Sequence, residues 1–173
     1  MSVKISPLVI AMIVTALLLA VAYRSSSADP NRPSRTRLEA SIAGYAPVKL
    51  RFKLATAYQL ARRRLQDRSE CRELFHLYDH EGLEVIDRST YSVAQSPAEL
   101  SICSYRSAAA YTKVGGMRTS LCPSRFEDLN VQKAAVILIH ESLHQAGMME
   151  WPHDPTGLRS LEINNLIRER CSL

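Results

Sequence analysis

The chain has 173 residues, with 22 lysines and arginines, 17 aspartates and glutamates and a formal net charge of +5. Its length and its hydrophobic share of 46% fit one ordinary globular domain with a single core. The positive balance is too mild to indicate nucleic-acid binding, so no nucleic-acid partner is expected.

Residues 1–28 have the composition of an export signal. Residues 5–22 are apolar apart from Ser6 and Thr15, follow a single Lys4 and end among small residues that suit cleavage. The apolar run is also nearly long enough to span a bilayer, so an uncleaved anchor that attaches the protein to a membrane through residues 5–22 is the alternative. We therefore expect a domain that is secreted or periplasmic after cleavage, or membrane-anchored outside the cytosol.

Residues 29–47 are expected to form a linker, because their first part, residues 29–37, is polar, basic and contains prolines. The folded domain is then expected over residues 48–173. Removal of the export segment takes away Lys4 and Arg24 and lowers the formal charge from +5 to +3.

The first part of the domain, residues 48–78, is predicted to be mainly helical, because apolar residues recur at steps of three and four. Residues 79–82 end this pattern. His76 and His80 have helical i, i+4 spacing, but no glutamate lies between them at the position of a general base, so we interpret them as surface residues. The apolar positions are Leu50, Leu54, Ala55, Tyr58, Ala61, Leu65, Leu74, Phe75 and Tyr78.

Strand character follows in residues 83–94, and residues 100–113 are predicted to form a strand and then a second extended piece. Gly115 and Gly116 indicate a turn before a further strand over residues 117–121. Helix, small antiparallel sheet, central helix, loop and terminal helix together predict an α+β fold.

The central helix, predicted over residues 131–146, contains the sequence His-Glu-Ser-Leu-His from His140 to His144. Asn130 suits the position that caps the helix, and Gly147 suits the position after its end. The two histidines are four residues apart, share one helix face and can bind the same metal ion. The alternative is a core helix whose histidines and Glu141 are hydrogen-bonded to neighbours.

Residues 140–150 resemble the metzincin pattern H-E-x-x-H-x-x-G-x-x-H, with Glu150 in the place of the third ligand. The resemblance implies Zn²⁺ held by His140, His144 and Glu150, with Glu141 as general base. It also implies a zincin-like fold, in which a small antiparallel sheet packs on the active-site helix. The chain departs from metzincins because no methionine follows Met149, so it has no methionine turn.

Glu162 is the alternative third ligand. It lies in a second helical pattern after His144, and gluzincins are similar in placing a glutamate on a following helix. His153 and Asp154 are further alternatives. The strand and Cys-Pro pair before the motif also look like aspzincin metallopeptidases, although the third-ligand region of this chain does not match theirs.

These residues predict an exported zinc-dependent metallopeptidase that hydrolyses peptide bonds in a peptide or protein substrate. Tyr105, Tyr111 and His153 are candidates for stabilising the oxyanion. By resemblance to zincins, residues 117–121 are a candidate edge strand that pairs with an extended substrate. Two alternatives stay open: a non-catalytic metal-binding interaction domain, and a zinc hydrolase of a non-peptide amide such as a cell-wall linkage.

The four cysteines are even in number in a domain that is expected to be exported, which predicts two disulfides. Three pairings are possible. We favour Cys103–Cys122 together with Cys71–Cys171, which would tie the first long helix to the C-terminus.

Overall fold

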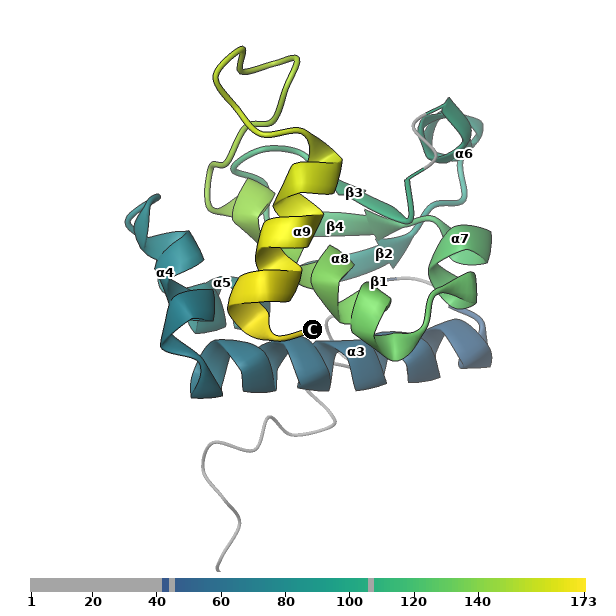
Figure 1. Cartoon of the computed structure of the whole chain (residues 1–173). Helices are drawn as coiled ribbons and strands as arrows, with labels where there is room; N and C mark the ends of the chain where they lie inside the picture. The colour runs from purple at the N-terminus through teal and green to yellow at the C-terminus, as the bar shows by residue number, and fades with distance from the viewer. Residues whose placement is uncertain (1–41, 44–45, 106–107) are drawn as a thin grey trace, which may run out of the picture. The chain divides into compact units, whose positions relative to one another are not determined.

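The structure is a computed structural model that describes residues 42–43, 46–105 and 108–173. The expected export segment, residues 1–28, lies outside these ranges, as does most of the expected linker. Within the described ranges, no helix is both long and apolar enough to cross a membrane. Helices and one small sheet together form an α+β arrangement, as the sequence predicts (Figure 1).

Helix α3, Val48–Asp67, has buried residues at steps of three and four along one face. The chain leaves the helix at Arg68, where φ is −116° and ψ is 114°, and starts again as α4, Ser69–His76. The helix predicted over residues 48–78 is therefore confirmed, with a break at Arg68. The buried positions of α3 are Leu50, Leu54, Ala57, Tyr58, Ala61 and Leu65.

The strand predicted over residues 83–94 is wrong for its first half, which forms helix α5, Gly82–Arg88. Only its second half is extended, as strand β2, Thr90–Val93. Packing decides this segment, because a short apolar run fits either a helix or a strand. A Cβ atom on Gly82 would lie 2.6 Å from the ring of Phe75, so α5 packs closely against α4.

The first half of the segment 100–113 is also helical rather than extended, as α6, Pro97–Tyr105. Glu99 Oε2 accepts a hydrogen bond from the backbone N of Ser96 at 3.0 Å, and Ser96 Oγ accepts one from the backbone N of Glu99 at 3.3 Å. This reciprocal pair is a capping box, which favours a helix start. The second extended piece of the segment is confirmed as β3, Ala110–Thr112.

Among the described residues, the strands form one sheet in the order β1-β2-β4-β3, where β1 is Ile42–Ala43 and β4 is Arg118–Leu121. Of the pairings among the described strands, those of β2 with β1 and with β4 are parallel, and that of β3 with β4 is antiparallel. The predicted antiparallel sheet is therefore wrong for two pairings. The chain crosses over through α6 and β3 between β2 and β4, which brings these two strands into the same direction.

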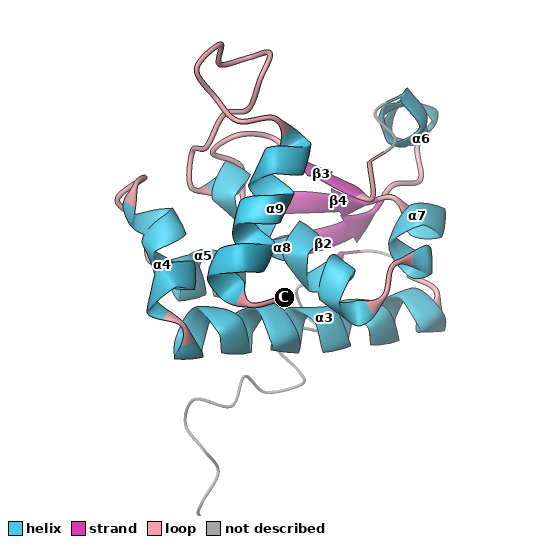
Figure 2. Ribbon diagram, in the orientation of Figure 1, coloured by secondary structure: helices cyan, strands magenta, loops and turns pink. Residues whose placement is uncertain are grey.

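The strand predicted over residues 117–121 is confirmed as β4, but its predicted role as an edge is wrong. It lies between β2 and β3, so its backbone groups are already paired on both sides. Among the described strands, β3 lies outermost on this side of the sheet (Figure 2). The predicted turn is present, with Gly115 at φ +72°. The backbone N of Gly115 donates to the carbonyl of His144 at 2.9 Å, which ties the turn to the central helix α8, Val131–Gln145.

Helix α8, Val131–Gln145, packs against α3, α5, β3 and α9, Ser160–Cys171. Figure 1 shows α3 running across the base of the view, with α8 and α9 above it. Helix α7, Pro123–Asp128, leads into α8. Asn130 Oδ1 accepts a hydrogen bond from the backbone N of Lys133 at 2.8 Å. Gly147 has φ +107°, so both predicted ends of the central helix are confirmed.

Two disulfides connect the outer helices to the rest of the domain. Cys71–Cys171 joins α4 to the end of α9, and Cys103–Cys122 joins α6 to the residue after β4. Both predicted pairings are confirmed.

Candidate metal centre

His140 and His144 face each other on α8, with their Nε2 atoms 3.0 Å apart. Both side chains are buried, with 3% and 7% of their surface exposed. The spacing of four residues places the two rings one turn apart on the same helix face. The two imidazoles therefore converge on one point inside the protein.

The opposite ring nitrogens fix the tautomer of each histidine. Nδ1 of His140 lies 2.9 Å from Oδ1 of Asn164 on α9, and Nδ1 of His144 lies 2.8 Å from the carbonyl oxygen of Met148. Because both partners are acceptors, we assign the hydrogen of each neutral ring to Nδ1. Each Nε2 then presents a lone pair toward the other, an arrangement that a shared cation or proton stabilises.

Glu150 brings a carboxylate to the same point. Its Oε2 atom lies 3.7 Å from Nε2 of His140, and one ligand atom each from His140, His144 and Glu150 lies within 4.8 Å of the others. Gly147, at φ +107°, lets the chain turn back beneath the end of α8, where the backbone N of Met148 donates to Leu143 at 3.0 Å. Oε2 of Glu150 is buried and has no hydrogen-bond partner.

The charges around the two histidines favour a cation. Burial works against the charged form of His140, but the neighbouring carboxyl groups of Glu150 and Glu141 outweigh it, so the pKa of His140 is raised. Interaction with His140 lowers the pKa of Glu150 despite its partial burial. Two imidazole nitrogens and one carboxylate oxygen are also the donor set of catalytic zinc sites, so the residues fit this ion.

Glu141 lies beside this group and is 6% exposed. Burial raises the pKa of its carboxyl group, while the two histidines and hydrogen bonding from Thr112 act in the opposite direction. Its Oε2 atom is buried without a hydrogen-bond partner. A buried carboxyl group next to a cation site, with one oxygen free, is suited to accept a proton from a bound water.

The alternative ligands lie elsewhere. Glu162 is exposed, and its Oε2 atom accepts a hydrogen bond from the backbone N of Arg159 at 2.7 Å, which caps the start of α9. His153 is exposed. Asp154 Oδ1 accepts from the backbone N and the hydroxyl of Thr156, at 2.9 and 2.7 Å. The structure therefore brings Glu150 to the histidine pair and leaves these three side chains outside it.

The residues expected to stabilise an oxyanion are not gathered at the histidine pair. Tyr105, on α6, is 90% exposed, and His153 is exposed as well. Tyr111 packs beside the buried Cys103 and Cys122. Tyr111 lies between Ala110 and Thr112 on β3. Its side chain therefore points to the opposite face of the sheet from the side chains of these two neighbours.

Asn164 is the residue of the centre that the sequence analysis missed. It lies on α9 next to Ile163, which is 1% exposed, and one turn before the fully buried Ile167. A polar residue beside the buried stripe of a helix needs a polar partner, so this pattern was the available signal. Ser160, at the start of α9, was also missed, and it contributes a small part of the lowering of the pKa of Glu150.

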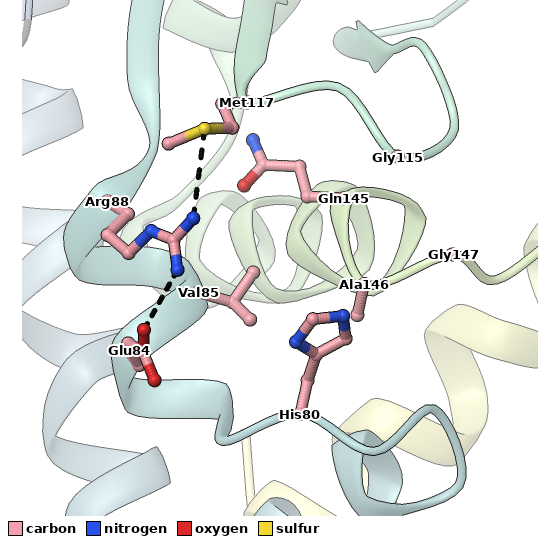
Figure 3. A pocket seen from close by; sticks show the side chains of 9 residues that line it. All are labelled: His80, Glu84, Val85, Arg88, Gly115, Met117, Gln145, Ala146 and Gly147. Carbon is pink, nitrogen blue, oxygen red and sulfur yellow. Dashed lines mark hydrogen bonds and ion pairs between the residues drawn. The ribbon is translucent and has the colours of Figure 1, made fainter.

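A hollow of about 300 Å³ lies next to the end of α8, between α5 and the turn that joins β3 to β4 (Figure 3). In this view the guanidinium group of Arg88 lies between the carboxylate of Glu84, at 2.8 Å, and the sulfur of Met117, at 3.9 Å. Gln145, the last residue of α8, lines the same hollow. His80 also lines this hollow. His76 lies 3.3 Å from Glu81, and both side chains are exposed, so His76 is a surface residue as predicted.

Comparisons with protein-family models, curated proteins and solved structures find no match for this chain.

Proposed function

We propose that this chain is an exported zinc-dependent metallopeptidase with a zincin-like arrangement. The observation that carries the proposal is the convergence of the two Nε2 atoms of His140 and His144, 3.0 Å apart, with each Nδ1 engaged by an acceptor. Held in this way, both rings offer lone pairs to one ion. The Glu150 carboxylate would complete a set of three protein ligands, as in catalytic zinc sites that keep a fourth position open.

Zinc in this position would lower the pKa of a bound water and polarise the carbonyl group of a substrate. Glu141 would accept a proton from that water and return it to the nitrogen of the leaving amine. Its buried carboxyl group suits this task, since burial raises its pKa above the ordinary value of a glutamate and so makes it a better proton acceptor. Asn164 and the Met148 carbonyl would keep the two histidines in the tautomer that binds the ion.

The edge strand β3 supports a peptide as the substrate. Thr112, the last residue of β3, lies beside Glu141, and the outer backbone groups of this strand are not paired with another described strand. An extended peptide that pairs with β3 would run past the general base. The edge strand in this proposal is β3 and not residues 117–121.

Export is supported by the two disulfides, because such bonds persist mainly in oxidising compartments. The expected signal or anchor in residues 1–28 agrees with this destination. The full chain is therefore expected to act outside the cytosol.

The test is the metal content of the full chain, purified in mild detergent with its disulfides oxidised, beside the His144→Ala variant. The proposal expects about one zinc per chain in the parent and little in the variant. The zinc-loaded parent should then hydrolyse fluorescently labelled casein, and Glu141→Ala should not. A folded parent that takes up no zinc would refute the proposal, and a Glu141→Ala variant with full activity would refute the mechanism.

A further inference from the structure

The segment between α8 and α9, residues 146–159, exposes large apolar side chains, and we name it the Trp151 loop. Trp151 is 51% exposed and Leu158 is 46% exposed. Met149 is 51% exposed, and Leu161 in the first turn of α9 is 67% exposed. Single exposed apolar residues are normal on a protein surface, but several on one segment indicate a surface that contacts an apolar partner.

Backbone contacts bring three of these residues close together. The backbone N of Trp151 donates to the carbonyl of Leu158 at 3.1 Å, so these two residues are neighbours across the loop. A Cβ atom on Gly157 would lie 3.0 Å from the carbonyl oxygen of Met149, so the two arms of the loop also meet there. The guanidinium group of Arg159 lies 5.3 Å from the centre of the Trp151 ring. The loop therefore carries a group of apolar side chains with a cation against its aromatic ring.

The loop projects away from the helices that it joins. Figure 1 shows it rising beyond the end of α8 and the start of α9. A peptide segment or a small molecule is usually received by a groove or a pocket, in which the apolar side chains line a concave surface. A projecting loop with exposed apolar side chains is suited instead to enter a flat apolar layer, such as the interface of a lipid bilayer.

The side chains of the loop fit the interface of a zwitterionic bilayer. Tryptophan is enriched at this depth because its ring is apolar and its N–H is polar, and an adjacent arginine can keep its charge in the water. Among the charged side chains of the loop, Glu150 lies 3.7 Å from His140, inside the candidate metal centre. Arg159 and Asp154 balance each other, so the loop has no charge that would select an anionic surface.

The sequence brings a bilayer within reach of this loop. Residues 5–22 are nearly long enough to span a bilayer, and in the uncleaved alternative they attach the domain to it. Residues 23–41, which precede β1, could bridge at most about 65 Å. A compact domain of this size is roughly 40 Å across, so such a tether allows the loop to reach the same bilayer.

We propose that the Trp151 loop inserts the side chains of Met149, Trp151 and Leu158 into the interface of a zwitterionic phospholipid bilayer. This contact is separate from the attachment expected through residues 5–22. Because Glu150 lies between Met149 and Trp151 in the chain, docking holds the candidate metal centre at the membrane surface. The inference goes beyond the proposed function and depends neither on zinc nor on peptide hydrolysis.

The fluorescence of Trp151 tests the proposal, because this residue is the only tryptophan of the chain. The full chain, with its disulfides oxidised, is reconstituted into vesicles of phosphatidylcholine or of phosphatidylcholine with brominated acyl chains. Bromine quenches tryptophan only at close range. We therefore expect the Trp151 emission to be much weaker in the brominated vesicles than in the ordinary ones.

Variants at exposed positions test whether the loop itself inserts. Leu158→Ser removes an exposed apolar side chain and should reduce the ratio of docked to undocked loops about 10-fold, because less apolar surface leaves the water. Quenching by the brominated lipid should fall accordingly, and Leu161→Ser should act in the same direction. Leu100→Ser is the matched control. Leu100 is 43% exposed on α6, which Figure 1 shows apart from the loop, so this variant should be quenched as the parent is.

Three results would overturn the proposal. The first is equal emission of the parent in the two kinds of vesicle. The second is quenching that both Leu158→Ser and Leu161→Ser leave unchanged, because the quenching would then come from tethering near the bilayer and not from insertion of the loop. The third is an emission that shifts to the blue with rising protein concentration but is not quenched by bromine, which would show that a second copy of the chain covers the loop.

Discussion

Oδ1 of Asn164 lies 2.9 Å from Nδ1 of His140, so a residue of the C-terminal helix determines which nitrogen of this histidine is free. Asn164→Ala removes the acceptor while leaving all three proposed ligands in place. We expect the zinc affinity to fall by about 10- to 100-fold, as for other partners of metal-bound histidines. A competition titration with a zinc-binding dye measures it.

Asn165→Ala is the matched control for this change. Asn165 is the next residue of α9, is exposed and accepts a hydrogen bond from Arg168 at 2.8 Å. Equal zinc affinities of the Asn164 and Asn165 variants would show that the contact with His140 does not tune the site.

The two glutamates that compete for the third ligand position should respond differently to alanine. Glu150→Ala should lower the zinc affinity by on the order of 100-fold or more, because it removes a proposed ligand. Glu162→Ala should leave the affinity unchanged and lower the free energy of unfolding by about 1 kcal/mol, because it removes the cap of α9. Zinc competition and urea unfolding of both variants test this. If Glu162→Ala lowers the zinc affinity more than Glu150→Ala does, the third ligand is Glu162 on α9.

Glu141→Gln should separate binding from chemistry. The variant keeps the shape of the side chain and all three proposed ligands, so zinc should stay bound at a parental level. Hydrolysis of labelled casein should fall by about 10²–10⁴-fold, the usual effect of a general base. Loss of zinc from this variant would instead give Glu141 a role as a ligand.

The two disulfides should contribute unequally to stability. Cys71–Cys171 links residues 100 positions apart, and Cys103–Cys122 links residues 19 positions apart. By the loop entropy of the unfolded chain, replacing the first pair with alanine should cost about 5 kcal/mol and the second about 3 kcal/mol. Thermal unfolding of the two double variants shows which disulfide contributes more to stability. A larger loss for the Cys103–Cys122 pair would contradict it.

The start of α6 should loosen in acid. Hydrogen bonds from the backbone of Ser96 and Gln95 lower the pKa of Glu99 below its ordinary value of 4.5. A lowered pKa in the folded state means that the capping contribution is present above the ordinary value and is lost as the pH falls through the folded one. The protection factors of the Gln95 and Ser96 amides against hydrogen exchange should fall over that range, and Glu99→Gln should remove this dependence on pH.

Local signals in the sequence were sufficient to predict helix α8 and the placement of His140 and His144 on one face of it. Asn130 and Gly147 mark the ends of the helix, and the spacing of His140 and His144 alone places both rings on one face. The position of Glu150 followed from a resemblance to a motif, and the structure brings that residue to the pair.

Some segments were predicted wrongly from the sequence. Their structure depends on contacts between residues far apart in the chain, or on contacts that compete with local preference. The apolar residues of α5 fit a strand by their local pattern. The close packing of Gly82 against Phe75 favours the helix instead. The direction of β4 relative to β2 depends on a crossover, which no local pattern records. Asn164 reaches His140 only through the packing of α9 on α8. In α6 the capping box of Ser96 and Glu99 was readable in advance, and it outweighs the strand preference of Ile102 and Tyr105.

The bond between Cys71 and Cys171 has a consequence for biogenesis. It anchors the last residues of α9 to α4, and α9 carries Asn164 to the histidine pair. A chain whose thiols are still reduced lacks this anchor, so Asn164 is held less firmly against His140. If the chain binds the proposed metal ion, formation of this disulfide should therefore precede full metal affinity, and the reduced chain should bind the ion more weakly.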